Sequence, residues 1–172
     1  DYVFDLDAPH GAPPALSVFG GKITTFRRLA EHAMDALSRF FPGLKPPWTE
    51  NAILPGGDMP KADFDTFLAD LKARKPFLEA STARRLAKAY GTRVDVFLGE
   101  ARRPADLGRD FGAGLSEAEI DYLMEAEWAR SVEDILWRRS KLGLHLPQAA
   151  IADIGRYLET PRGTRAASRK NA

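Results

Sequence analysis

The spacing of hydrophobic residues changes in character within the first part of the chain. Residues 2–6 and 15–19 are short runs rich in β-branched and aromatic side chains, separated by a connector with three prolines. This pattern predicts two short strands around a loop. From residue 24 the apolar positions recur at helical steps, which predicts a helix over residues 24–41. Two strands alone are marginally stable, so we expect them to pair with a larger sheet.

Residues 42–60 are typical of a connector between domains. They contain five prolines and three glycines, which interrupt both helices and strands. We place a domain boundary within this connector, between residues 47 and 48. Three apolar residues, Trp48, Ile53 and Leu54, indicate that the connector packs against the rest of the protein.

Beyond residue 47 the hydrophobic pattern is almost entirely helical. Amphipathic spacing predicts helices over residues 62–73, 81–90, 93–100, 117–129, 132–141 and 147–158. Ser116 and Glu119 have the spacing of a capping box, and Gly91 stands where a helix-ending glycine belongs. The core-facing residues predicted for the two helices after Ser116 are Ile120, Leu123, Met124, Trp128, Ile135, Leu136 and Trp137.

The predicted fold class is therefore mainly α. Residues 1–47 supply two short strands and one long helix, and residues 48–160 form a helical C-terminal domain. Residues 161–172 form a small, polar, basic tail that we expect to be disordered. We interpret the basic residues of this tail as a solvated terminus rather than as a membrane contact.

The composition excludes several classes of function. Among 172 residues 25 are basic and 24 acidic, so the net charge of +1 gives no basic field that would attract nucleic acid. The absence of cysteine excludes disulfides, thiolate metal sites and thiol catalysis. The three histidines lack partners at metal-ligand spacing, so we expect no bound metal. No apolar run approaches the ~18 residues of a membrane span, and the first residues lack the features of a signal peptide, so we expect a cytosolic or cytosol-facing protein.

The most informative motif lies between the second predicted strand and the long helix. Gly20 and Gly21 let a ligand approach the backbone closely because they carry no Cβ atom. The helix start that follows offers unpaired N–H groups, while Lys22 adds a positive charge and Thr24 a hydroxyl. Together they are typical of a site for an anion or a carbonyl group. The alternative is an ordinary strand-to-helix turn with a capping threonine, and the spacing of a Walker loop is absent.

A second motif places three cations, Arg138, Arg139 and Lys141, in the last turn of a predicted helix. Glu133 and Asp134 stand in its first turn. This arrangement complements the helix dipole, which is the simpler interpretation. The alternative is an arginine patch that docks onto a neighbouring domain or an anionic group.

Two stretches of the chain are distinctive when taken together: Ser17-Val-Phe-Gly-Gly-Lys-Ile-Thr-Thr25 and Leu136-Trp-Arg-Arg-Ser-Lys141. Between them, in order, stand Leu54-Pro-Gly-Gly57, Tyr90-Gly91, Asp106-Leu-Gly108 and Glu125-Ala-Glu-Trp128. With these motifs the chain resembles, over nearly its whole length, the C-terminal part of FAD-dependent (aerobic) glycerol-3-phosphate dehydrogenases.

The resemblance implies an enzyme that oxidises sn-glycerol 3-phosphate to dihydroxyacetone phosphate. It implies that a hydride passes to FAD and that electrons pass on to membrane quinone. In this family the corner formed by Gly20, Gly21, Lys22, Ile23 and Thr24 lies against the pyrimidine side of the flavin. A helix start and a lysine suit the negative charge that reduced flavin carries there. Arg138, Arg139 and Lys141 are the candidate residues for an interdomain contact.

The chain departs from the family in what it lacks. The dinucleotide-binding GxGxxG, most of the substrate domain and any calcium-binding loop are absent. We therefore expect its main partners to be the N-terminal FAD and substrate domains of the same polypeptide. We expect the isolated chain to be inactive and not to retain FAD, and the parent enzyme to lie at the inner face of the cell membrane. A homodimer stays open.

Two alternatives remain at this point. The first is that the parent is a glycerol-3-phosphate oxidase that passes electrons to oxygen, since no residue here decides the acceptor. Otherwise the chain is a free-standing helical protein-interaction module, which leaves residues 20–25 without a role.

Overall fold

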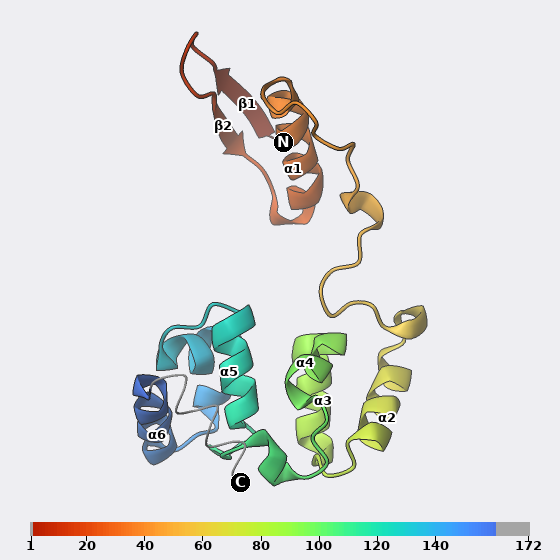
Figure 1. Ribbon diagram of the computed structural model, residues 1–172, viewed down its shortest axis with the longest axis vertical. Helices are drawn as coiled ribbons and strands as arrows, with labels where there is room; N and C mark the ends of the chain where they lie inside the picture. Colours follow the sequence, from red (N-terminus) through yellow and green to blue (C-terminus); the bar gives the residue numbers. More distant parts are fainter. Residues whose placement is uncertain (1, 161–172) are drawn as a thin grey trace. The chain divides into compact units, whose positions relative to one another are not determined.

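The computed structural model describes residues 2–160 and divides the chain into two compact units. The first unit comprises residues 1–53, coloured red to orange in Figure 1, and the second begins at Leu54. The division thus falls a few residues after position 47, where the prolines suggested a boundary. The predicted disordered tail, residues 161–172, lies outside the described residues.

The first unit is a β-hairpin with one helix beside it (Figure 1). Strand β1 (Tyr2–Asp7) pairs antiparallel with β2 (Ala15–Gly20), with Phe4 opposite Val18. The predicted helix is found in three pieces: a 3-10 turn (Ile23–Thr25), α1 (Phe26–Leu37) and a second 3-10 turn (Ser38–Phe40). Within the described residues the two strands pair only with each other.

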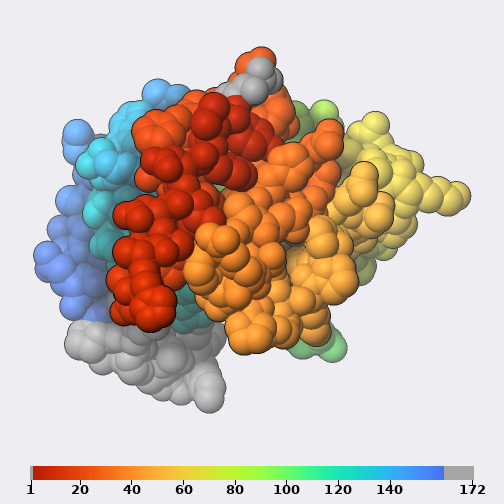
Figure 2. Space-filling model, turned by 90° about the horizontal axis from the view of Figure 1, so that it is seen from above, coloured from red at the N-terminus to blue at the C-terminus, as the bar shows by residue number. Residues whose placement is uncertain are grey.

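The connector up to residue 53 belongs to the first unit, and Thr49 bonds it to α1. The Thr49 hydroxyl donates to Glu31 Oε1 at 2.5 Å, and Arg27 pairs with the other Glu31 oxygen at 3.0 Å. The Thr49 hydrogen bond is the main reason that the pKa of Glu31 lies below its usual value. In the space-filling view of Figure 2 the connector, in light orange, lies against the rest of this unit.

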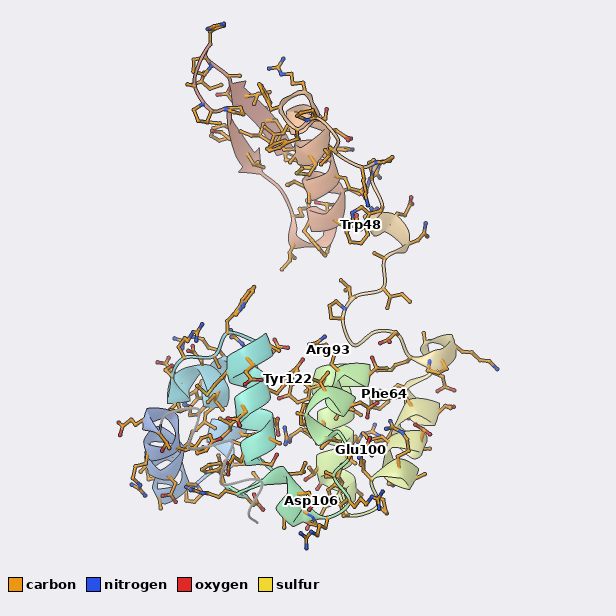
Figure 3. The ribbon with its side chains drawn as sticks, viewed as in Figure 1. Trp48, Phe64, Arg93, Glu100, Asp106 and Tyr122 are labelled. Carbon is orange, nitrogen blue, oxygen red and sulfur yellow. The ribbon has the colours of Figure 1, made fainter. Side chains whose placement is uncertain are left out.

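The apolar side chains of the connector are not packed as predicted. Trp48, Ile53 and Leu54 are each about 70% exposed, and Trp48 is labelled in Figure 3. The prediction was wrong because the attachment to α1 is polar: it is made by the backbone N–H and the hydroxyl of Thr49, while the neighbouring apolar side chains stay exposed.

The second unit is helical and confirms the mainly α class. Its helices are α2 (Phe64–Arg74), α3 (Ala80–Tyr90), α4 (Val94–Leu98), α5 (Glu117–Ala126), a π-helix (Asp134–Arg139) and α6 (Gln148–Glu159). Short 3-10 turns lie in the connections, at Pro60–Ala62, Gly91–Arg93, Pro104–Leu107 and Leu142–Leu144. The largest fully buried apolar side chains of the core are Leu71, Val94, Leu98, Leu115, Ile120, Leu123, Ile135, Leu136 and Ile154.

The ends of these helices follow the expected local chemistry, with one correction. Asp63 caps α2 by accepting from the backbone N–H groups of Asp65 and Thr66. Ser116 caps α5 by accepting from Glu119 N at 3.3 Å. The reciprocal half of the predicted capping box is not formed, because the Glu119 carboxylate is buried and bonded to other groups.

A buried polar cluster joins α3 to α5. Glu119 is fully buried, and its carboxylate accepts from Arg85 at 2.6 and 2.8 Å and from the Tyr90 hydroxyl at 2.6 Å. Arg85 also donates to the carbonyl of Gly114 at 2.8 Å. Burial, reinforced by the Glu119 charge, raises the pKa of Tyr90 well above its ordinary value, so this hydroxyl keeps its proton as a donor.

The start of the second unit passes very close to the end of α3. Thr92 N donates to the carbonyl of Gly56 at 3.1 Å. A Cβ atom at Gly91, whose φ is +54°, would lie 1.9 Å from that Gly56 oxygen. Gly91 therefore serves both as the predicted helix end and as the point of close backbone contact.

Glu119→Ala is expected to lower the free energy of unfolding of the full chain by about 3–5 kcal/mol, because it leaves the Arg85 charge without its buried partner. Asp70→Ala removes an exposed partner of Arg74 and is expected to change stability by less than about 1 kcal/mol. Urea unfolding measures both. Equal losses for the two variants would contradict the assigned role of the buried cluster.

Gly91→Ala is expected to destabilise the chain more than Gly99→Ala. Both glycines follow a helix and have positive φ, so each alanine costs roughly 1–2 kcal/mol in backbone strain. Only at Gly91 does the new Cβ meet backbone, whereas nothing lies within 4 Å at Gly99. Overpacking should add about 1–3 kcal/mol at Gly91, and similar melting temperatures for the two variants would show that the close contact relaxes freely.

Candidate functional site

The glycine-lysine corner between β2 and α1 has the backbone shape that the motif predicted. Gly20 and Gly21 have φ values of +84° and +101°, which L side chains rarely adopt. A Cβ atom at Gly21 would lie 3.0 Å from the Leu29 side chain. Lys22 then continues in an extended conformation before the first helical turn. The chain thus bends sharply at two residues without side chains, where a ligand can approach the backbone.

No threonine caps the helix at this corner. The Thr25 N–H and its hydroxyl both donate to the carbonyl of Lys22, at 2.9 and 3.0 Å. The N-cap residues of the 3-10 turn and of α1, Lys22 and Thr25, accept no capping hydrogen bond with their side chains. The first N–H groups of a helix, here those of Ile23 and Thr24, have no acceptor within the helix. The capping turn considered from the sequence is therefore not the arrangement found.

Apolar side chains around this corner are unusually exposed. Phe19 is 60% exposed, Ile23 89% and Phe26 61%. A single chain rarely leaves neighbouring large apolar groups in water unless another group covers them. The corner thus combines polar N–H donors and a lysine with an apolar surface, which suits a ligand that is both planar and able to accept hydrogen bonds.

The basic motif lies in the second unit, on a π-helix instead of the predicted α-helix. Ser140 N donates to the carbonyl of Ile135 at 3.0 Å, a five-residue step. The wider helical turn leaves Ile135 and Leu136 fully buried, as predicted, while Trp137 remains 43% exposed. π-Helical turns are rare in proteins, and those that occur are often found at functional sites.

Each cation of the basic motif makes a contact within its own unit. Arg138 pairs with Asp134 at 2.8 Å and Glu133 at 2.9 Å, two side-chain ion pairs along its own helix. Arg139 Nε donates to the carbonyl of Glu127 at 2.9 Å, and Lys141 donates to the carbonyl of Trp137. The corner and the basic motif belong to different units. The interdomain contact for these cations stays a prediction.

Sequence reasoning missed two pockets of the second unit. One has a volume of about 550 Å³ and is lined by Thr82, Arg85, Asp110, Ser116 and His145 among others. The other, of about 600 Å³, is lined by Tyr90, Arg93, Tyr122, Glu127, Trp128 and Arg139 together with Pro55 and two alanines. No single motif signals them, because their residues come from separate segments.

Trp128 is the clearest error of the predicted core. Helical spacing placed it inward, but α5 ends at Ala126 and Trp128 follows with a φ of +57°. Its side chain turns outward and is 77% exposed. Periodicity fails here because the residue lies beyond the helix on which the periodicity was counted.

Over residues 2–160, no group of three or more His, Asp or Glu side chains could hold a metal ion. None of the helices in that range is long and apolar enough to cross a membrane.

Comparison with known proteins places the chain in a family. Residues 47–160 match the C-terminal domain of alpha-glycerophosphate oxidase, and the chain belongs to this family. It is 47% identical over 158 residues, 92% of its length, to the aerobic glycerol-3-phosphate dehydrogenase of Escherichia coli strain K12. It is 46% identical over 149 residues, 87% of its length, to the D-erythritol 1-phosphate dehydrogenase of Brucella abortus strain 2308. The chain spans 31% and 30% of the lengths of these two relatives.

The hydrogen bonds of Asp134, the first residue of the π-helix, predict a defined acid response. Asp134 accepts from the backbone N–H groups of Arg130 and Ser131 at 2.9 and 3.0 Å, and these bonds lower its pKa to about 2. A lowered pKa contributes stability above the unfolded value near 4 and loses it as the pH falls through about 2. Carboxyl NMR titration should place the midpoint of Asp134 near 2.

Asp134→Asn should remove that part of the acid dependence of unfolding and leave the stability of the variant flatter between pH 4 and pH 2. A midpoint for the wild-type Asp134 carboxyl at or above 3.8, its ordinary value, would contradict the hydrogen bonds assigned to it.

Proposed function

We propose that this chain is the C-terminal portion of an FAD-dependent dehydrogenase that oxidises sn-glycerol 3-phosphate to dihydroxyacetone phosphate and passes the electrons to quinone. The observation that carries the proposal is the 47% identity, over 92% of the chain, to a relative named aerobic glycerol-3-phosphate dehydrogenase. The same name, without "aerobic", belongs to a relative in Pseudomonas aeruginosa that is 47% identical over 160 residues.

The substrate class is a polyol phosphate. The Brucella relative is named for D-erythritol 1-phosphate, and it is 46% identical over this region. The chain is similar to relatives named for glycerol 3-phosphate and for D-erythritol 1-phosphate. Both compounds are phosphate monoesters with a neighbouring secondary alcohol, and we propose a substrate of that kind. Glycerol 3-phosphate is proposed within that class because it is in the names of both relatives at 47% identity.

The residues of the corner fit one edge of a flavin. FAD, when bound, supplies the acceptor for the hydride. Gly20 and Gly21 would let the ring approach the backbone, and the N–H groups of Ile23 and Thr24 would donate to its oxygen and nitrogen atoms. Lys22 would stabilise the negative charge that gathers on that edge after reduction.

The two units have different roles in this proposal. The hairpin and α1 would complete the FAD domain, since the edges of its two strands lack further partners among the described residues. The helical unit would pack against that domain, with Arg138, Arg139 and Lys141 at the contact. Electron transfer to quinone would place the whole enzyme at the inner face of the membrane, as a peripheral protein.

Oxygen is the second candidate for the electron acceptor, because the matching family is described by an oxidase. Turnover of the full-length enzyme with a soluble quinone analogue, in air and under nitrogen, separates the two. Quinone-dependent turnover under nitrogen supports the dehydrogenase. Peroxide formation in air at a rate equal to substrate loss, without quinone, supports the oxidase.

FAD titration tests the assignment of the chain as one wall of the flavin site. The 172-residue chain alone should bind FAD weakly or not at all, and the full-length protein should bind it at one per chain. Flavin fluorescence measures both. Tight binding by the isolated chain would contradict the proposal that the remaining walls of the site lie elsewhere.

Lys22→Met in the full-length enzyme is expected to make flavin reduction harder by about 1–3 kcal/mol, because a charge that stabilises the reduced flavin is lost. Lys45→Met, which removes an exposed lysine of the connector, is the matched control and should leave the midpoint potential unchanged. Spectroelectrochemical titration gives both potentials. An unchanged potential for the Lys22 variant would reject its role beside the flavin.

A further inference from the structure

The pocket of about 600 Å³ in the second unit brings two arginines to one place. Arg93 follows α3, whereas Arg139 ends the π-helix, and both line this pocket with Tyr122 and Trp128. The two arginines are 46 positions apart, so only the packing of α3, α5 and the π-helix makes them neighbours of one cavity. Its volume lies within the range of small-molecule sites.

Both guanidinium groups are anchored at one end only. Arg93 Nε donates to the Tyr122 hydroxyl at 2.7 Å, and Figure 3 shows these two side chains directed toward one another. Arg139 Nε donates to the carbonyl of Glu127 at 2.9 Å. Among residues 2–160, no group accepts a hydrogen bond from the terminal nitrogens of either arginine. Anchoring at Nε fixes each planar group and leaves its other donors for a ligand.

The charge of the pocket is positive. Its two arginines face one carboxylate, that of Glu127, which accepts from the Tyr122 hydroxyl at 3.3 Å and forms no ion pair within 4 Å of either guanidinium. Fixed guanidinium groups recognise carboxylates and phosphates through paired N–H donors. The favoured occupant is therefore an oxyanion.

Trp128 supplies the apolar rim of this pocket at a cost in backbone energy. Its φ of +57° is a left-handed conformation, which is sterically unfavourable for a bulky L residue. The N–H of Ala129, the next residue, closes the helix end by donating to the carbonyl of Leu123 at 3.0 Å. Glycine would make the same turn without strain. The tryptophan is 77% exposed, so core packing does not explain its presence.

We infer that this pocket binds a small oxyanion, a phosphate or a carboxylate, that carries an apolar or planar body. Arg93 and Arg139 hold the oxyanion, and the body lies along Trp128 and the ring of Tyr122. Pro55, Ala89 and Ala126 complete the apolar lining. All the lining residues lie in the second unit, and binding there is tested on the 172-residue chain without the dehydrogenase activity.

Calorimetric titration of the full 172-residue chain with phenyl phosphate and with benzoate tests this inference. At least one of the two should bind saturably at constant ionic strength, and phenol, which lacks the oxyanion, should bind at least tenfold more weakly. Arg93→Gln and Arg139→Gln should each weaken binding about tenfold, the effect of losing about 1.4 kcal/mol. Arg102→Gln, which removes an exposed arginine outside the pocket, is the matched control and should not change binding.

Trp128→Gly separates a ligand contact from a structural role. Because glycine adopts the positive φ freely, this variant should unfold at the same or a higher temperature while binding the probe at least tenfold more weakly. A stabilising role for the tryptophan would instead lower the unfolding temperature and leave affinity unchanged, and that result would overturn the inference.

The fluorescence of Trp128 gives a local readout. In a background with Trp48→Phe and Trp137→Phe it is the single tryptophan, and saturation with phenyl phosphate or benzoate should shift its emission. No saturable response to either anion, or binding that both arginine variants leave intact, would overturn the inference. So would arginine-dependent self-association of the chain without small-anion binding, since the pocket would then be a protein interface.

Discussion

The buried carboxylate of Glu119 sets the spacing of the helical unit. It is fully buried, and it is held by Arg85 and Tyr90 from α3 while it stands on α5. A buried charge is costly unless its partners surround it, so α3 and α5 are held in the one arrangement that brings those groups together. Replacing the cluster by apolar side chains could give equal stability, but it would not define the same contact.

Features at the ends of these two helices depend on that arrangement. The ring of Tyr90 meets the ring of Tyr122 edge to face, with centroids 5.4 Å apart, and Phe97 completes the group. Tyr122 then anchors Arg93, which lines the pocket beside Trp128. One polar cluster in the core thus positions the side chains that form the candidate anion site at the surface. The interior and the pocket are two parts of one packing arrangement.

The first unit differs from the second in how much of its surface is left uncovered. A two-stranded hairpin and one helix leave Phe19, Ile23 and Phe26 largely exposed, beside a helix start that its own N-cap side chains do not cap. The helical unit buries a continuous core of its own. This contrast agrees with a proposal in which residues 1–53 complete a larger flavin domain, and in which residues 54–160 fold as a unit and dock against it.

The sequence by itself determined the features that depend on neighbours along the chain. Hydrophobic spacing located both strands and the helices, Gly20 and Gly21 marked the bend, Ser116 marked the start of α5, and the family motifs pointed to the dehydrogenases. Tertiary structure decided what depends on contacts between distant segments. The Glu119 carboxylate does not complete the predicted capping box because it is buried and bonded to Arg85 and Tyr90. Trp128 points outward because α5 ends before it. The π-helix likewise has no local signal, and neither does the pocket that Arg93 and Arg139 both line. The free energy that determines both features comes from packing between segments far apart in sequence.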